Sequence, residues 1–255
     1  MVQREWNKRD HGGGRGRSLV NLSLQIPNTL LHDGHAWKPN AADHMVAATR
    51  RALGEAARTK CGFVVHASYA FLGSAEEGGQ VGRRLRPIVD AALEAERLVL
   101  ESDRRAVVLR LGYVYGPELR DLRAYRRAFQ LRRAYWAGAR DCRQHHLHTS
   151  DAARALLLAA TTRPDGPVLY VTDGSPTSFA DFMDDFAHQV GRARPLHIPG
   201  VARRLVHLVV REPHQEMCEL AAHGRPMPRL PGFTPRYPDH RAGFRQVIEA
   251  WQQPS

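Results

Sequence analysis

Cysteine is scarce in this chain of 255 residues, which contains only Cys61, Cys142 and Cys218. An odd number of cysteines without close spacing provides neither a disulfide framework nor a CxxC metal site. Scarce and unpaired cysteine is typical of a reducing compartment, so we expect a cytoplasmic protein.

Long hydrophobic runs are also missing. Residues 1–17 are polar and basic without the apolar centre of a signal peptide, and no run of about 18 apolar residues follows them. We therefore expect no membrane partner. Because residues 1–17 are rich in glycine and charge, we predict that they form a disordered lead-in.

Lysine occurs only at positions 8, 38 and 60, so arginine supplies nearly all of the basic residues behind the formal charge of +11. Several arginines follow one side of a predicted helix at 119–136, namely Arg120, Arg123, Arg126 and Arg127. A solvated helix face is the favoured interpretation, and an anionic substrate or a nucleic acid are the alternatives. Nucleic acid is disfavoured because no base-reading motif or aromatic platform accompanies these arginines.

The rest of the sequence alternates between strand-like and helical segments. Strands are predicted at 18–27, within 61–73, at 106–117 and at 168–173, and loops at 74–86 and 213–240. Helices are predicted at 43–58, 87–102 and 119–136, from Asp151, at 178–190 and at 201–209. This order predicts an α/β fold with a parallel sheet and right-handed crossovers.

The stretch from Cys61 to Gly73 is the centre of the predicted sheet, because its apolar residues end in a small polar cluster. Ligands in open α/β sheets sit beyond the carboxyl ends of the strands. Here that position belongs to His66, Ser68 and Tyr69. The alternative is an ordinary core strand with a hydrogen-bonded serine.

Six stretches between residues 18 and 251 form a recognisable series. They are SLVNLSL (18–24), GFVVHASYAFLG (62–73), LRLGYVYGP (109–117), HLHTSDAARALLLA (146–159), LYVTDGSPTSFADF (169–182) and LPGFTPRYPDHRAGFRQVIEAW (230–251). Their order and spacing resemble the extended short-chain dehydrogenase/reductases, the NAD-dependent epimerase/dehydratase family. The resemblance implies a Rossmann-like parallel sheet with a smaller C-terminal substrate lobe. Residues 18–117 would form a partial NAD(P)-binding domain and 118–255 mainly the lobe, with 146–175 returning to the core.

The same resemblance implies the site residues of an oxidoreductase, epimerase or dehydratase. Ser68 falls at the family's catalytic serine or threonine. The residues expected to line NAD or NADP are Ser23, Leu24, Ala67, Leu111, Tyr113 and Val114. Those expected to face the substrate, a sugar nucleotide or similar small molecule, are Tyr69, Tyr113 and His148.

The chain departs from the family at its start. The family's first three strands and the glycine-rich turn that seats the pyrophosphate have no counterpart here, so we expect an N-terminally incomplete sheet. The sheet edge left uncovered predicts a homodimer through that side or poor solubility. An N-terminally truncated chain would explain the same departure.

The chain departs again at the family's catalytic Tyr-x-x-x-Lys, whose positions are occupied by Ile88 and Ala92. All seven tyrosines follow the last lysine, Lys60, so no Tyr-x-x-x-Lys occurs anywhere. A phenol of pKa about 10 needs a nearby cation to act as an acid near neutrality. The usual tyrosine chemistry is therefore unsupported. Tyr69 or Tyr113 acting as a substitute acid, and a non-catalytic ligand sensor or interaction protein, are the alternatives.

Three histidines lie close together at His145, His146 and His148. They lack the helical i, i+4 spacing with a carboxylate, and a structural zinc would need four ligands. We therefore expect no metal, and we interpret His148 as a packing or substrate-contacting residue.

Overall fold

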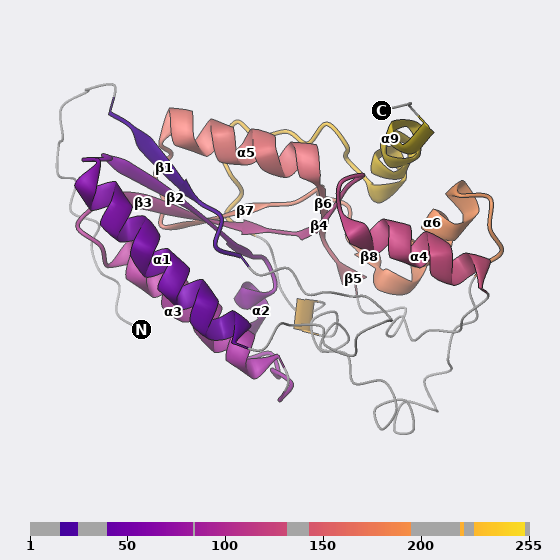
Figure 1. The fold of residues 1–255 in the computed structure, drawn as a ribbon, viewed down its shortest axis with the longest axis horizontal. Helices are drawn as coiled ribbons and strands as arrows, with labels where there is room; N and C mark the ends of the chain where they lie inside the picture. The colour runs from indigo at the N-terminus through magenta and orange to yellow at the C-terminus, as the bar shows by residue number, and fades with distance from the viewer. Residues whose placement is uncertain are drawn as a thin grey trace.

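The computed structural model describes residues 16–24, 40–83, 85–131, 143–194, 220–221 and 227–252. Its main sheet has four parallel strands in the order β1-β2-β3-β7 (Figure 1). They are β1 (Ser18–Asn21), β2 (Phe63–Tyr69), β3 (Arg105–Leu111) and β7 (Val168–Val171). In the register of this sheet, Val65 lies between Val20 and Val107. The parallel sheet predicted from the sequence is thus confirmed.

Helices cover both faces of this sheet. α1 (Ala41–Arg58) and α3 (Arg86–Leu100) lie side by side on one face, and α5 (Thr149–Thr162) lies on the other (Figure 1). Side chains of β2 alternate between the layers: Val65 packs with the α5 side, and Val64 packs with Ala56 and Val99 of α1 and α3. Because both faces are covered, the strand reads as a continuous apolar run.

A smaller lobe follows β3. It contains α4 (Arg120–Gln130), α6 (Phe179–Gln189) and α9 (His240–Gln252). Two short strand pairs join it to the sheet: β4 (Tyr113–Tyr115) with β6 (His146–His148), and β5 (Arg143–Gln144) with β8 (Thr177–Ser178). Its core is largely aromatic, formed around Tyr115, Tyr125, Phe129, Phe179, Phe182, Phe186 and Phe244.

Local sequence signals explain the helix starts. Pro87 occupies the first turn of α3, where a missing N–H costs nothing. Ser178 caps α6, because its Oγ accepts a hydrogen bond from the Asp181 amide at 3.0 Å.

The strand predicted at 106–117 is instead two strands that separate at Gly112. The Gly112 amide donates to the Val171 carbonyl, whereas the Tyr113 amide donates to the His145 carbonyl. A Cβ at position 112 would lie 2.9 Å from the His145 carbonyl oxygen, so the change of partner depends on glycine. The chain thereby leaves the main sheet and enters the lobe.

Other boundaries also differ from the predictions. Within the predicted loop 74–86, the helix α2 (Leu72–Glu76) occupies the first residues and α3 begins at Arg86. β1 ends at Asn21 rather than continuing through Leu24, and α5 begins at Thr149, before Asp151. In the predicted loop 213–240, residues 220–221 are helical and Arg229 pairs with Tyr170 of β7. The predicted helix 201–209, residues 132–136, residues 25–27 and residues 1–15 lie outside the described residues.

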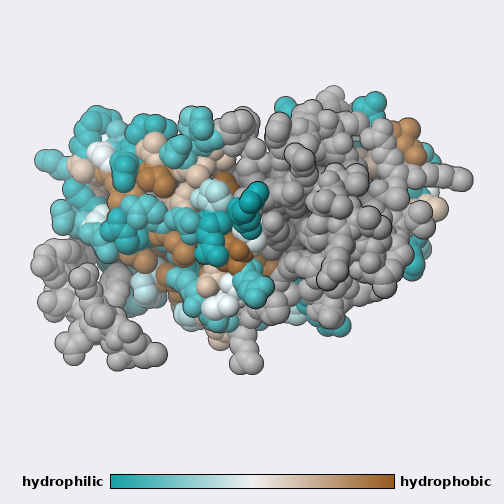
Figure 2. All heavy atoms as spheres, turned by 90° about the horizontal axis from the view of Figure 1, so that it is seen from below, coloured by the Kyte–Doolittle hydropathy of each residue, from teal (hydrophilic) through white to brown (hydrophobic). Residues whose placement is uncertain are grey.

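The surface on the α1 and α3 side contains both apolar and polar side chains. Figure 2 shows brown apolar surface between teal polar atoms on this face, where Ala42, Val46 and Leu93 remain partly exposed. Over the ranges that the structure describes, no helix has the length and apolarity needed to cross a membrane.

Candidate functional site

The carboxyl end of β2 carries Ser68, whose side chain is buried. Its Oγ donates a hydrogen bond of 2.5 Å to Oε1 of Glu96, a buried residue of α3. The hydroxyl therefore points beneath α3 and is already engaged by a carboxylate.

Glu96 is in turn held by Arg110 of β3. The guanidinium donates from Nε and Nη2 to the two carboxylate oxygens of Glu96, at 3.0 and 2.6 Å. Its Nη1 donates to Glu76 of α2 at 2.5 Å and to the Tyr170 hydroxyl at 3.0 Å. Burial opposes the charge on Arg110, but the hydrogen bonds to Glu96 and Glu76 outweigh burial and raise its pKa. We call Ser68, Glu96, Arg110, Glu76 and Tyr170 the buried ion-pair network, in which only the Glu76 side chain reaches the surface.

The two positions of the family's acid/base pair lie in the core. Ile88 is 3% exposed and Ala92 is 1% exposed, and both belong to one apolar cluster between α1, α2 and α3. Tyr69 and Tyr113 pack against this same cluster, both partly buried. Two phenols thus lie near the place where the family has its tyrosine, but Ile88 and Ala92 add no proton or charge.

Four of the residues expected to contact the cofactor come together. Ala67 and Leu111 are members of the cluster beneath α5, and Leu24 and Val114 pack against it. We call these four residues the apolar wall. It lies at the carboxyl ends of β1, β2 and β3, where open α/β sheets bind ligands.

The side chains of the other two expected cofactor residues make different contacts. Ser23 belongs to a polar group with Asn21 and Thr49: its Oγ is 2.9 Å from Thr49 Oγ1, and its amide donates to Asn21 Oδ1 at 3.1 Å. Tyr113 makes edge contacts with the rings of His146 and Phe182 in the lobe.

The residues present match only part of an NAD(P) site. Leu24 and Val114, the partly exposed members of the apolar wall, suit contact with a nicotinamide ring, whereas Ala67 and Leu111 are buried. Along the described part of the chain, however, no strand leads into a glycine-rich turn and helix of the kind that binds pyrophosphate.

His66 lies on the same side of β2 as Ser68 and is buried. Its Nδ1 is 2.9 Å from Asn21 Nδ2, so it accepts a hydrogen bond in its neutral form. Burial lowers the pKa of His66 to about 4. A neutral imidazole at physiological pH cannot supply a cation to the site.

His148 caps α5 and contacts the C-terminal helix. Its Nδ1 accepts from the Ser150 amide at 3.2 Å, and its Nε2 is 2.9 Å from Gln246 Oε1 of α9. Burial lowers the pKa of His148. Both ring nitrogens are thus used in joining α5 to α9. Across the residues that can be described, no three His, Cys, Asp or Glu side chains are grouped so as to hold a metal ion.

Two buried polar side chains, Asp173 and Tyr115, were not predicted from the sequence. Asp173 follows β7, and its Oδ1 accepts from the Ser175 amide at 3.1 Å. Its Oδ2 and the Tyr115 hydroxyl are both buried, and neither has a hydrogen-bond partner among the described residues. Burial raises the pKa of Asp173 to about 7, and it raises that of Tyr115 above its ordinary range. The motif VTD signals only a strand end, so no sequence pattern distinguishes this carboxyl.

No protein-family model matches the chain. The chain is 32% identical over 161 residues to 3-diazoavenalumate denitrifying reductase from Streptomyces sp. This match covers 61% of the chain and 51% of the relative, so the chain spans about half the length of the curated relative it matches.

Solved structures resemble the whole chain at low sequence identity. MoeE5 in complex with UDP-glucose and NAD has a TM-score of 0.60 and 24% identity, covering 91% of this chain and 78% of that one. Human epimerase family protein SDR39U1 with NADPH has a TM-score of 0.64 and 17% identity, covering 94% and 84%. A dTDP-glucose 4,6-dehydratase from Bacillus anthracis has a TM-score of 0.59 and 12% identity, covering 92% and 72%. The chain therefore shares the Rossmann-like fold of these structures, as its motifs predict.

Proposed function

We propose that this chain is an NAD(P)-binding oxidoreductase for a small molecule, with residues 18–117 contacting the cofactor and residues 118–255 mainly the substrate. The observation that carries the proposal is the apolar wall at the carboxyl ends of the parallel strands. Similar structures that hold NAD or NADPH support it. The bound cofactor would supply or accept a hydride.

The apolar cluster around Ile88 and Ala92 restricts the kinds of reaction that the chain could catalyse. Reduction of a ketone forms an alkoxide that needs a proton, and these two residues provide no donor. We propose a substrate whose reduction needs no acid from this position. The curated relative is named a denitrifying reductase of a diazo compound. Replacing an aryl diazonium group by hydride forms a C–H bond, breaks the C–N bond and releases N2, without a proton from the protein.

Sugar nucleotides are the second substrate class. Similar structures are complexes with UDP-glucose or UDP-glucuronic acid. Their chemistry needs an acid/base group, and Tyr69 and Tyr113 are the phenols packed nearest the required position. If the substrate is a sugar nucleotide, Tyr69→Phe or Tyr113→Phe should abolish turnover. If the substrate is a diazonium compound, turnover should persist in both variants.

The test begins with cofactor binding by the chain. Calorimetric titration with NAD(H) and NADP(H) should show saturable binding by the wild type. Leu24→Glu places a carboxylate at the apolar wall and should weaken binding about tenfold or more, since an unpaired charge is costly there. Leu22→Glu is the matched control, because Leu22 is 62% exposed two residues earlier. Absence of binding, or equal losses in both variants, would contradict the proposal.

Turnover is then measured as oxidation of NADH or NADPH in the presence of 4-carboxybenzenediazonium or UDP-glucose. A non-catalytic ligand sensor is the second candidate function, favoured by Ser68 bonded to Glu96 and by Ile88 and Ala92 in the core. Cofactor binding without turnover of either substrate would support the sensor. Turnover would exclude it.

A further inference from the structure

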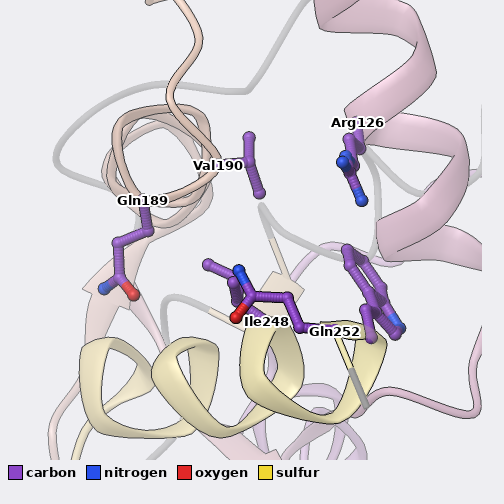
Figure 3. Close-up of a pocket in the computed structure, with 6 residues that line it drawn as sticks. Arg126, Gln189, Val190, Ile248 and Gln252 are labelled. Atoms are coloured by element: carbon purple, nitrogen blue, oxygen red, sulfur yellow. The ribbon is translucent and has the colours of Figure 1, made fainter. Parts of the chain in front are cut away.

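A pocket of about 190 Å³ lies in the lobe, between α4, α6 and α9. Figure 3 shows its lining residues, which come from all three helices and not from the sheet. They are Arg126, Gln189, Val190, Ile248, Trp251 and Gln252. The pocket thus combines an aromatic and aliphatic surface with a guanidinium and two carboxamides. It is separate from the strand ends proposed to bind the cofactor.

The aromatic surface of the pocket is held in place. The Trp251 indole donates from Nε1 to the Pro117 carbonyl at 3.0 Å. Its ring makes an edge contact with Phe186, with the ring centroids 6.2 Å apart. Gln189 is also fixed, since its Nε2 donates to the Arg241 carbonyl at 3.2 Å. A ligand would therefore meet surfaces that are already ordered.

Two guanidinium groups lie beside this indole. Cζ of Arg123 is 4.9 Å and Cζ of Arg126 is 5.8 Å from the Trp251 ring centroid, within the range of cation–π attraction. Over the described ranges, neither arginine forms an ion pair or a hydrogen bond with another side chain. Within these ranges, their N–H donors are therefore not engaged by another side chain.

Among the described residues, none of those that line the pocket is acidic. Asp185, at the α6–α9 contact, is bonded to His240 and Arg241 instead. Glu249 of α9 is not among the lining residues. α4 carries four arginines and one acidic residue, Asp121, so this helix is net positive, which favours an anion.

We propose that this pocket binds a small aromatic carboxylate of the benzoate class. The ring would contact Val190, Ile248 and Trp251, and the carboxylate would accept hydrogen bonds from Arg126, whose planar donors match a carboxylate. A volume of about 190 Å³ is large enough for one aromatic ring, and the pocket adds polar groups at its lining that an enclosed apolar cavity of about 150 Å³, which holds benzene, lacks. The proposal does not depend on the oxidoreductase function.

The test is a titration of the full chain with sodium benzoate, followed through the indole N–H signal of Trp251 in NMR spectra. Trp251→Phe assigns that signal. We expect a saturable shift with half-saturation near or below about 1 mM. Arg126→Gln should weaken binding about tenfold, since hydrogen bonds to charged groups are strong. Arg120→Gln is the matched control, an exposed arginine of α4 outside the pocket.

Two further ligands test whether the pocket requires both the ring and the carboxylate. Benzamide has the ring without the charge, and inorganic phosphate has the charge without the ring, so both should bind at least about tenfold more weakly than benzoate. The proposal is overturned if no shift saturates, if phosphate binds as well as benzoate, or if Arg120→Gln and Arg126→Gln weaken binding equally. Circular dichroism checks that each variant is folded.

Discussion

Protonation of Asp173 should make the stability of the folded chain depend on pH. Its pKa rises from an ordinary value of 3.8 to about 7 because the carboxyl is buried. The folded state therefore binds the proton more firmly than the unfolded state, and the contribution of Asp173 to stability falls as pH rises through this window. Asp173→Asn should remove this fall and, at pH 8, raise the free energy of unfolding by on the order of 2 kcal/mol. Urea denaturation of both proteins at pH 5 and pH 8 measures the difference. A variant that is less stable at both pH values would refute this account.

His66 should show the opposite dependence. Its pKa falls from 6.5 to about 4, so its contribution to stability is complete above 6.5 and is lost as pH falls toward 4. His66→Asn keeps an acceptor for Asn21 and should remove this acid sensitivity. His188→Asn, which changes an exposed histidine of α6, should leave it unchanged. Because Asp173 and His66 have opposite slopes between pH 4 and 6.5, the differences between variants and wild type are the quantities to compare.

The sequence could predict which residues occupy the catalytic positions but not what surrounds them. Register alone places Ile88 and Ala92 at the tyrosine and lysine positions, and the structure buries both. The partner of Ser68 could not be predicted, because Glu96 lies 28 residues away on a helix whose rotation depends on packing. The same holds for Asp173, whose burial depends on the aromatic core of the lobe.

At the scale of elements, the buried ion-pair network fixes α2 and α3 to β3. Replacing Glu96 with Gln leaves the Arg110 guanidinium buried without its main carboxylate, so the free energy of unfolding should fall by about 3 kcal/mol. Glu94→Gln is the matched control on α3, because Glu94 pairs with exposed Arg97 and should hardly affect stability. Urea denaturation near pH 7 distinguishes the two variants. Equal losses in both would show that the network contributes no more than a surface pair.

The sequence predicted the presence of helices and strands better than the residues at which they begin and end. The periodicity of α1 and α3 and the apolar runs of β2 and β3 come from burial on a repeating face, which the sequence records directly. The separation of β3 from β4 at Gly112 depends on the approach of the His145 carbonyl from a distant segment. The short helix α2 was missed because its five residues, which include Gly73, are too few to show a helical period.

At the scale of the whole molecule, one side of β1 has no strand beside it within the described ranges. Val20 in this strand is 39% exposed. An open edge can pair with a second copy, and we predict a dimer through β1. Light scattering should show that Val20→Lys shifts the dimer to a monomer, since an edge lysine opposes strand pairing. Leu157→Lys, on exposed α5, is the control and should leave the dimer intact. A wild-type monomer would exclude this interface.

The burial of Ile88 and Ala92 also affects any attempt to restore the missing chemistry. Both side chains contribute to the cluster that joins α1, α2 and α3. A tyrosine at 88 would overpack that cluster, at a cost of roughly 1–3 kcal/mol, and a lysine at 92 would be desolvated. The same two residues that deprive the chain of an acid/base pair thus stabilise it. Engineering the pair back would require the surrounding helices to be repacked first, so two substitutions alone should yield a less stable protein rather than a conventional dehydrogenase.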